Sequence, residues 1–209
     1  MMRIPVLLVA SLFAGLFGWT ENSTLTLSAE EVATGVTPVS VQGNSVKLTP
    51  KNTSIQFVGT HEGDKPDPRK GGFGEFTGTA EVDSDGTLQS VAFEIDTTSL
   101  WTEFPKLTAH LKSPDFFDVR TYPKASFKST SVASGSDGKA VVTGEFTLLK
   151  VKKEIKIPVT TSISPEGLTL TSDFKLDRTQ FGMSYGQGKV SDDVALSVII
   201  GKPTEVPGS

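Results

Sequence analysis

The chain has 209 residues, of which 36% are hydrophobic and 21% charged, with 20 Gly, 12 Pro and no Cys. This composition suits one modest globular domain and excludes a collagen-like or fully disordered chain. The lack of cysteine excludes a disulfide scaffold, a cysteine zinc site, an iron–sulfur cluster and a cysteine nucleophile. The net charge is −4, and charges of both signs are scattered along the chain. We therefore expect no nucleic-acid partner.

The N-terminus has the pattern of an export signal. Arg3 precedes an apolar run over residues 4–19, which is shorter than the roughly 20 residues of a membrane-spanning helix. We predict a signal peptide over residues 1–18, with cleavage as late as residue 29, and a periplasmic or secreted product without a membrane span after cleavage. A retained N-terminal anchor is the alternative. Residues 19–43 are expected to form a flexible arm, 44–202 the folded domain and 203–209 a loose tail.

Within the folded domain, apolar residues recur at every second position, which is the period of a sheet with one buried face. The runs fall at residues 46–48, 55–58, 76–82, 91–95, 125–128, 140–148, 155–163, 168–176 and 194–200. Turn sequences at 83–86, 136–138 and 165–167 favour antiparallel pairing of neighbouring runs. We predict an all-β, eight-stranded antiparallel barrel, with a two-sheet sandwich as the alternative. Residues 65–72, with two Pro and two Gly, are interpreted as a loop at its rim.

The segment between Trp101 and Tyr122 breaks the two-residue period. Leu107 and Leu111 stand four residues apart, as on one face of a helix, and Ser113-Pro114 is typical of a helix start. We predict one or two short helices at one end of the barrel, the second beginning at Ser113, with the segment 107–117 acting as a lid.

Small and large residues alternate among the predicted inward positions. The small ones are Gly78, Ala80, Ala140, Gly144, Thr161 and Ser172. They either leave a lined tunnel or complement the large residues in a solid core. The register predicts Phe93, Phe127, Phe146 and Phe174 inside. A slip of one residue would instead place Glu94, Lys128, Glu145 and Lys175 inside.

The sequence offers little for catalysis. His61 and His110 are the only histidines, they lack metal-ligand spacing, and no G-x-S-x-G elbow is present. We therefore expect neither an enzyme nor a metal site. The basic cluster at residues 150–156 is interpreted as a solvated hairpin.

Several motifs follow one another in a recognisable order. The first are His61-x-Gly63, Gly72-Phe73, Phe76-x-Gly78 and Asp96-x-x-Ser99. The central stretch is His110-Leu111-x-Ser113-x-Asp115-Phe116-Phe117-Asp118, continuing to Tyr122-Pro123-x-x-x-Phe127-x-Ser129. The last are Gly144-x-Phe146-Thr147-Leu148 and Asp177-Arg178-x-x-Phe181-Gly182. From Val46 to Gly201 this order resembles the YceI-like family of exported, lipocalin-like polyisoprenoid-binding proteins. The chain departs from the family after Leu148, where a Gly-Val-Thr-Lys-like turn is replaced by Leu149-Lys150-Val151-Lys152-Lys153.

The resemblance implies a lipocalin-like barrel whose elongated apolar cavity holds a polyisoprenoid or the tail of an isoprenoid quinone, in a non-catalytic exported binding protein. The residues expected to line the cavity are Phe57, Phe76, Phe93, Ile95, Leu111, Phe116, Phe117, Phe127, Phe146, Ile157, Leu170 and Phe174. His61, His110 and Arg178 are candidate contacts to a polar head group.

Arg178 is also expected to bond backbone carbonyls of a tight turn. No cofactor is expected, and the chain could pair as a homodimer. Two other functions stay open: an enzyme acting on a lipid or quinone head group at the barrel mouth, and a packed barrel that serves as a stress-related interaction domain.

Overall fold

The computed structural model describes residues 35–208, which form one antiparallel sheet of eleven strands. The strands are β1 (Ser45–Leu48), β2 (Thr53–His61), β3 (Asp67–Phe73), β4 (Phe76–Val82), β5 (Leu88–Asp96), β6 (Leu100–Thr102), β7 (Lys124–Ser134), β8 (Lys139–Leu148), β9 (Val151–Ser164), β10 (Gly167–Asp177) and β11 (Asp193–Ile200). The helices are α1 (Pro105–Leu111) and the 3-10 turns η2 (Thr97–Ser99) and η3 (Arg178–Phe181). The sheet order is β1-β4-β5-β7-β8-β9-β10-β11-β2-β3-β6.

The sheet curls into a barrel of eight effective strands. Only Gly74 and Glu75 separate β3 from β4, and only η2 separates β5 from β6. Because β3 pairs with β6 and β4 pairs with β5, each successive pair acts as one long bent strand. Counted in this way, eight strands form the ring and β1 is an addition to the edge of β4. The predicted all-β, eight-stranded antiparallel barrel is confirmed, although its long strands are broken into more pieces than the sequence indicates.

Two strands were not predicted, β3 and β6. Residues 65–72 are not a rim loop, because most of them belong to β3. The two-residue period is hidden there by Pro68 and by two glycines. At Gly71 a side chain would collide with the Phe57 ring, and at Gly72 a Cβ would lie 2.7 Å from the Ile55 carbonyl oxygen. These glycines therefore mark a strand against which an aromatic ring packs.

The helical segment has one helix. α1 begins with Pro105, as the first turn of a helix permits. The predicted second helix at Ser113 is wrong: the Ser113 carbonyl accepts from the amides of Phe116 and Asp118, and its Oγ accepts from the Asp115 amide at 3.3 Å. Ser and Asp side chains compete with a helix in this way by stabilising turns.

The β8–β9 turn, where the chain departs from the family pattern, still forms. Leu149 adopts φ 54° there, in the left-handed region that is costly for a branched side chain. The hairpin is therefore closed by a residue type that rarely adopts the left-handed backbone conformation found there.

The far end of the barrel is sealed. Val46, Leu48, Leu168 and Ile200 have no exposed surface there. The described part of the predicted arm, residues 35–43, is tied across this end, because Val39 and Leu168 exchange backbone hydrogen bonds of 2.9 and 3.0 Å. The tail is held as well, since the Thr204 amide donates to the Pro50 carbonyl at 2.7 Å. The predicted leader, residues 1–18, lies outside the described residues.

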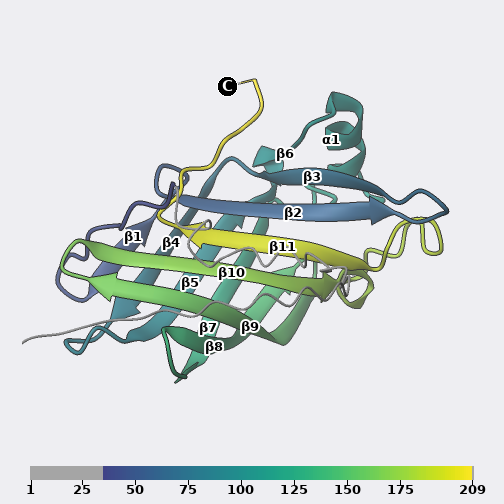
Figure 1. The fold of residues 1–209 in the computed structure, drawn as a ribbon. Helices are drawn as coiled ribbons and strands as arrows, with labels where there is room; N and C mark the ends of the chain where they lie inside the picture. Colours follow the sequence, from purple (N-terminus) through teal and green to yellow (C-terminus); the bar gives the residue numbers. More distant parts are fainter. Residues whose placement is uncertain (1–34, 209) are drawn as a thin grey trace, which may run out of the picture. The chain divides into compact units, whose positions relative to one another are not determined.

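The opposite end is the mouth. The β2–β3 turn, α1 and the β10–β11 loop gather there (Figure 1). The Glu62 amide donates to the Lys189 carbonyl at 2.8 Å, and the His110 and Tyr185 rings lie 5.1 Å apart between centroids. No helix among residues 35–208 is long and apolar enough to cross a membrane.

Candidate functional site: an apolar cavity inside the barrel

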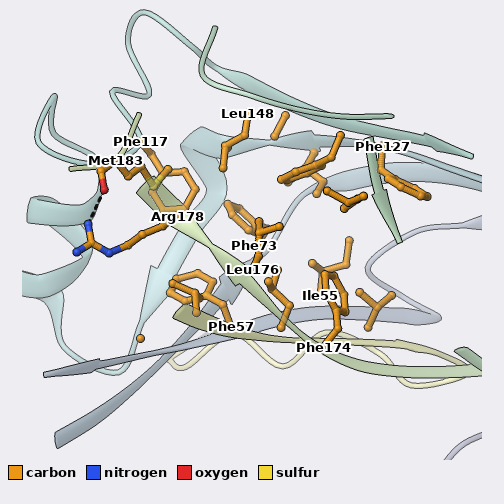
Figure 2. Close-up of a pocket in the computed structure, with 18 of the residues that line it drawn as sticks. Ile55, Phe57, Phe73, Phe117, Phe127, Leu148, Phe174, Leu176, Arg178 and Met183 are labelled. Atoms are coloured by element: carbon orange, nitrogen blue, oxygen red, sulfur yellow. Dashed lines mark hydrogen bonds between the residues drawn. The ribbon is translucent and has the colours of Figure 1, made fainter. Parts of the chain in front are cut away.

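A cavity of about 250 Å³ occupies the barrel below the mouth. Strands β2, β3, β5 and β7–β11 line it together with α1 and the segment after it (Figure 2). Eleven of the twelve residues expected to line the cavity do so: Phe57, Phe93, Ile95, Leu111, Phe116, Phe117, Phe127, Phe146, Ile157, Leu170 and Phe174. The inward register is confirmed by the four phenylalanines and by the exposure of Glu94, Lys128, Glu145 and Lys175.

Phe76 is the exception. It does not belong to the cavity lining, although it is only 5% exposed. Its ring packs edge-on against Phe93, with the centroids 6.1 Å apart. Phe76 therefore belongs to the solid core beside the cavity, because correct strand parity does not tell how deep a side chain lies.

The small inward residues have two different surroundings. A Cβ on Gly144 would lie 2.5 Å from the Phe127 ring, and a Cβ on Gly78 would lie 2.6 Å from the Phe93 ring. Neighbouring rings therefore occupy the space that a side chain at these positions would need. Gly59 on β2 lines the cavity and has no atom within 4 Å of such a Cβ. Rings thus occupy the space inside Gly78 and Gly144, whereas the space inside Gly59 is open.

The polar lining residues lie almost entirely at the mouth. They are His61 at the end of β2, Arg69 near the start of β3, His110 on α1, Arg178 at the start of η3 and Tyr185 in the β10–β11 loop. Ser172 is the polar residue deep in the lining, and it is 4% exposed. Its hydroxyl donates to the Pro158 carbonyl at 2.6 Å. All the other lining residues are hydrophobic or glycine, so the deep cavity offers no side-chain donor to a guest.

Arg178 is a structural anchor. Its guanidinium donates to the carbonyls of Met183, Tyr185, Val190 and Ser191 at 2.6–3.0 Å and to Asp192 Oδ1 at 3.3 Å. Figure 2 shows the group turned away from the labelled apolar side chains. These bonds use all five N–H groups of the guanidinium. The structure therefore supports the expected role in a tight turn and not the head-group contact.

η3 is stabilised at its first residue by Asp177, which precedes Arg178. The Asp177 carboxylate accepts from the Thr179 hydroxyl at 2.6 Å and from the Thr179 amide at 2.9 Å. The Thr179 hydroxyl is the main reason that the pKa of this carboxyl lies below its usual value, since it stabilises the charged form.

Three aromatic rings meet across the mouth. His110 on α1, Phe116 after it and Tyr185 on the β10–β11 loop have centroids 5.1–5.4 Å apart. His110 Nε2 lies 3.0 Å from Asp115 Oδ2. The predicted lid segment 107–117 thus covers the mouth jointly with the β10–β11 loop. That loop escaped the sequence analysis because it has no apolar period, although Gly182, Gly186 and Gly188 marked it as a turn-rich segment.

His61 and Arg69 occupy another part of the mouth. They lie on the adjacent strands β2 and β3 and both line the cavity. The Arg69 guanidinium pairs with the Asp67 carboxylate and lies 4.6 Å from the centre of the Phe104 ring. Arg69 was missed because its segment was interpreted as a loop.

Comparison with known proteins agrees with this architecture. The model of the YceI-like domain matches residues 46–200. A UPF0312 protein of Pseudomonas putida is 38% identical over 91 residues, which cover 43% of this chain and 47% of that protein. The chain thus spans about half the length of this curated relative.

Solved structures share the fold. BcnA of Burkholderia cenocepacia superimposes with a TM-score of 0.64 at 23% identity, over 71% of this chain and 94% of that one. A polyisoprenoid-binding domain from Saccharophagus degradans gives 0.53 at 13% identity, over 74% and 95%.

Proposed function

This chain belongs to the YceI-like domain family, and we propose that it is an exported, non-catalytic binding protein that holds a polyisoprenoid or the tail of an isoprenoid quinone. The observation that carries the proposal is the cavity of about 250 Å³, whose deep lining is hydrocarbon apart from one serine that is already hydrogen-bonded. The similar fold of a domain described as polyisoprenoid-binding supports it.

The chemistry of the lining selects the guest. A polar group placed deep in the cavity would lose its hydrogen bonds to water without a replacement, at a cost of roughly 1–3 kcal/mol. A hydrocarbon chain has no such cost. At about 0.8 kcal/mol per buried CH₂-sized group, every ten carbons that are buried would gain on the order of 8 kcal/mol before the costs of immobilisation. An isoprenoid chain therefore needs few polar contacts.

We assign the polar head of the guest to the mouth. The mouth offers this head group the side-chain nitrogen and hydroxyl groups of His61, His110, Arg69 and Tyr185. Arg178 is excluded from this role because its donors are engaged by the β10–β11 loop. The isoprenoid lipid therefore binds with its tail toward the sealed end of the barrel and its head group at the mouth.

Extraction of the purified protein with organic solvent, followed by mass spectrometry, tests the proposal. We expect a co-purified prenyl lipid, and uptake of added ubiquinone by the stripped protein. Repeated absence of both would overturn it.

A matched pair of variants ties the lipid to the cavity. Val198 and Ala195 both lie on β11, but Val198 lines the cavity and Ala195 is exposed on the outside. Val198→Phe should abolish most of the bound lipid, whereas Ala195→Phe should retain it. Equal lipid content in the two variants would mean that the lipid binds elsewhere.

A further inference from the structure

The wall of the barrel is incomplete between β9 and β10. The two strands pair from their hairpin as far as Thr160 and Thr171. Beyond that point β9 pairs on its other side with β8, and β10 pairs on its other side with β11. Among the described pairs, none joins residues 151–159 of β9 to residues 172–177 of β10. We call this interval the window. The fold view shows the two strands joined at their hairpin (Figure 1).

Pro158 marks the place where the pairing stops. In an antiparallel ladder the N–H and C=O of one residue point toward the same neighbouring strand. The Pro158 carbonyl accepts from the Ser172 hydroxyl of β10, so the side of Pro158 that lacks an N–H faces β10. Continuing the register beyond Thr160 and Thr171 would pair Pro158 with Asp173. Proline has no N–H to donate to Asp173. The Pro158 carbonyl accepts from the buried Ser172 hydroxyl instead of from the Asp173 amide.

The window opens on the cavity. Ile155 and Ile157 on one edge and Phe174 and Leu176 on the other line the cavity, and all four are partly exposed. Backbone groups left without a protein partner are found where water reaches them. Water therefore reaches the unpaired strand edges, directly beside the side chains that line the cavity.

Side-chain contacts lie at both ends of the window. The Ser172–Pro158 hydrogen bond closes its lower end. At its upper end Lys153 Nζ lies 3.3 Å from Gln180 Oε1, and Phe181, which is 1% exposed, packs against Phe146 with the ring centroids 5.3 Å apart. The edges of the window are apolar toward the cavity, at Ile155, Ile157, Phe174 and Leu176, and they carry Lys156 and Lys175 on the outside.

We propose that the window between β9 and β10 is a lateral route by which long isoprenoid chains reach the cavity, and through which the part that exceeds the cavity extends. The inference rests on the proposed function. A cavity of about 250 Å³ lies below the usual 300–1,000 Å³ of small-molecule sites, so a long chain requires such an extension. Short chains fit through the mouth alone.

The experiment closes the window with a covalent cross-link. Lys156 and Lys175 are exposed on opposite edges, and the chain has no native cysteine to interfere. The double variant Lys156→Cys/Lys175→Cys is joined with a bismaleimide. The control is Glu145→Cys/Glu154→Cys, joined in the same way, because these exposed residues are direct partners in the fully paired β8–β9 ladder. Uptake rates are measured for farnesol, a short prenyl alcohol, and solanesol, a long one.

We expect the window cross-link to slow the uptake of solanesol by about tenfold or more and to leave farnesol unchanged, while the control cross-link changes neither. Unchanged uptake of solanesol after cross-linking would overturn the lateral route alone. Failure of the uncross-linked protein to take up either alcohol would overturn the proposed function and the route together.

A second measurement reads the window without a ligand. In wild-type protein the amides of Lys156 and Lys175 should exchange hydrogen rapidly, and Pro158→Val should extend the ladder and protect them. Wild-type protection equal to that of the β8–β9 amides would overturn the window itself.

Discussion

Two walls of this barrel are built differently. On β4, β5 and β7, which we call the packed wall, the inward side chains are almost completely covered: Ala80, Val82, Val91, Phe93, Ile95, Ala125 and Phe127 are at most 9% exposed. On β9, β10 and β11, the cavity wall, the inward residues toward the mouth are partly exposed: Ile155, Ile157, Phe174, Leu176, Val194, Leu196 and Val198. Both walls have the same alternating pattern in the sequence. Residues of both walls line the cavity, and the walls differ in how completely neighbouring groups cover their side chains.

The two walls of this one sheet are expected to contribute differently to stability and to ligand binding. Side chains of the packed wall fill space against neighbours, as rings over glycines do at Gly78 and Gly144. Side chains of the cavity wall are partly exposed and therefore have fewer contacts to lose. The packed wall should therefore carry most of the free energy of unfolding, and the cavity wall most of the affinity for a guest.

The largest expected effect concerns the loop that ends the cavity wall. That loop is held by hydrogen bonds to Arg178, which is 4% exposed. Arg178→Ala would leave several backbone carbonyls without a donor and should lower the free energy of unfolding by about 4 kcal/mol. Urea denaturation measures this. Arg120→Ala, at an exposed arginine, is the control and should change little. A wild-type midpoint for Arg178→Ala would contradict the anchoring role.

The next prediction compares the walls directly with one residue type. Ile95 on β5 is 7% exposed, whereas Ile157 on β9 is partly exposed, and both line the cavity. Ile95→Ala should lower the free energy of unfolding by about 3 kcal/mol, because it removes packed contacts, and Ile157→Ala by only about 1 kcal/mol. Equal losses in denaturation experiments would show that the two walls are packed alike.

Glycines on the two sides give a smaller and opposite pair of effects. A Cβ on Gly144 would lie 2.6 Å from the Lys128 carbonyl oxygen, which is backbone and cannot move aside. Gly144→Ala should therefore cost about 2 kcal/mol. Gly59→Ala meets open space and should stabilise the protein by about 0.5 kcal/mol through the unfolded chain. Thermal melting of both variants checks the sign. A stabilised Gly144→Ala would refute the close packing.

The smallest effect on stability is expected at the lid, where the change should appear in ligand release. Leu111 is half-buried, Tyr185 is 48% exposed, and both line the cavity from opposite sides of the mouth. Leu111→Ala and Tyr185→Ala should each speed the release of a bound prenyl lipid by about tenfold, with little change in the melting temperature. Lys106→Ala, on the exposed face of α1, serves as the control. Release at the wild-type rate would mean that the lid does not hold the guest.

The sequence was sufficient for the barrel and for most of the cavity lining. Strand parity placed Phe93, Phe127, Phe146 and Phe174 inside, because each one-residue step reverses the face of the sheet. Parity says nothing of depth, which is why Phe76 was assigned to the cavity. It also failed at β3, where Pro68 and the two glycines removed the pattern although the backbone is extended.

The remaining features depend on contacts between distant segments. Arg69 lies beside His61 at the cavity mouth only because β2 and β3 pair. Residues 37–42 have no period of their own, yet they bind the sealed end through partners such as Leu168 and Gly201. To predict the window, one must know which side of Pro158 faces β10, and this follows only from its hydrogen bond with Ser172. None of these can be obtained from local sequence.

The pairing of β2 with β11 has a consequence for how the chain folds. Residues 53–58 find their partners at residues 195–200, so the ring closes by joining segments from opposite ends of the domain. Contacts this far apart in sequence require a large loop to be closed and make folding slow. A ribosome that has made only the first ten strands has supplied every element of the barrel except the one that joins β10 to β2. The nascent chain therefore leaves two strand edges open, at β2 and β10, until the last strand emerges.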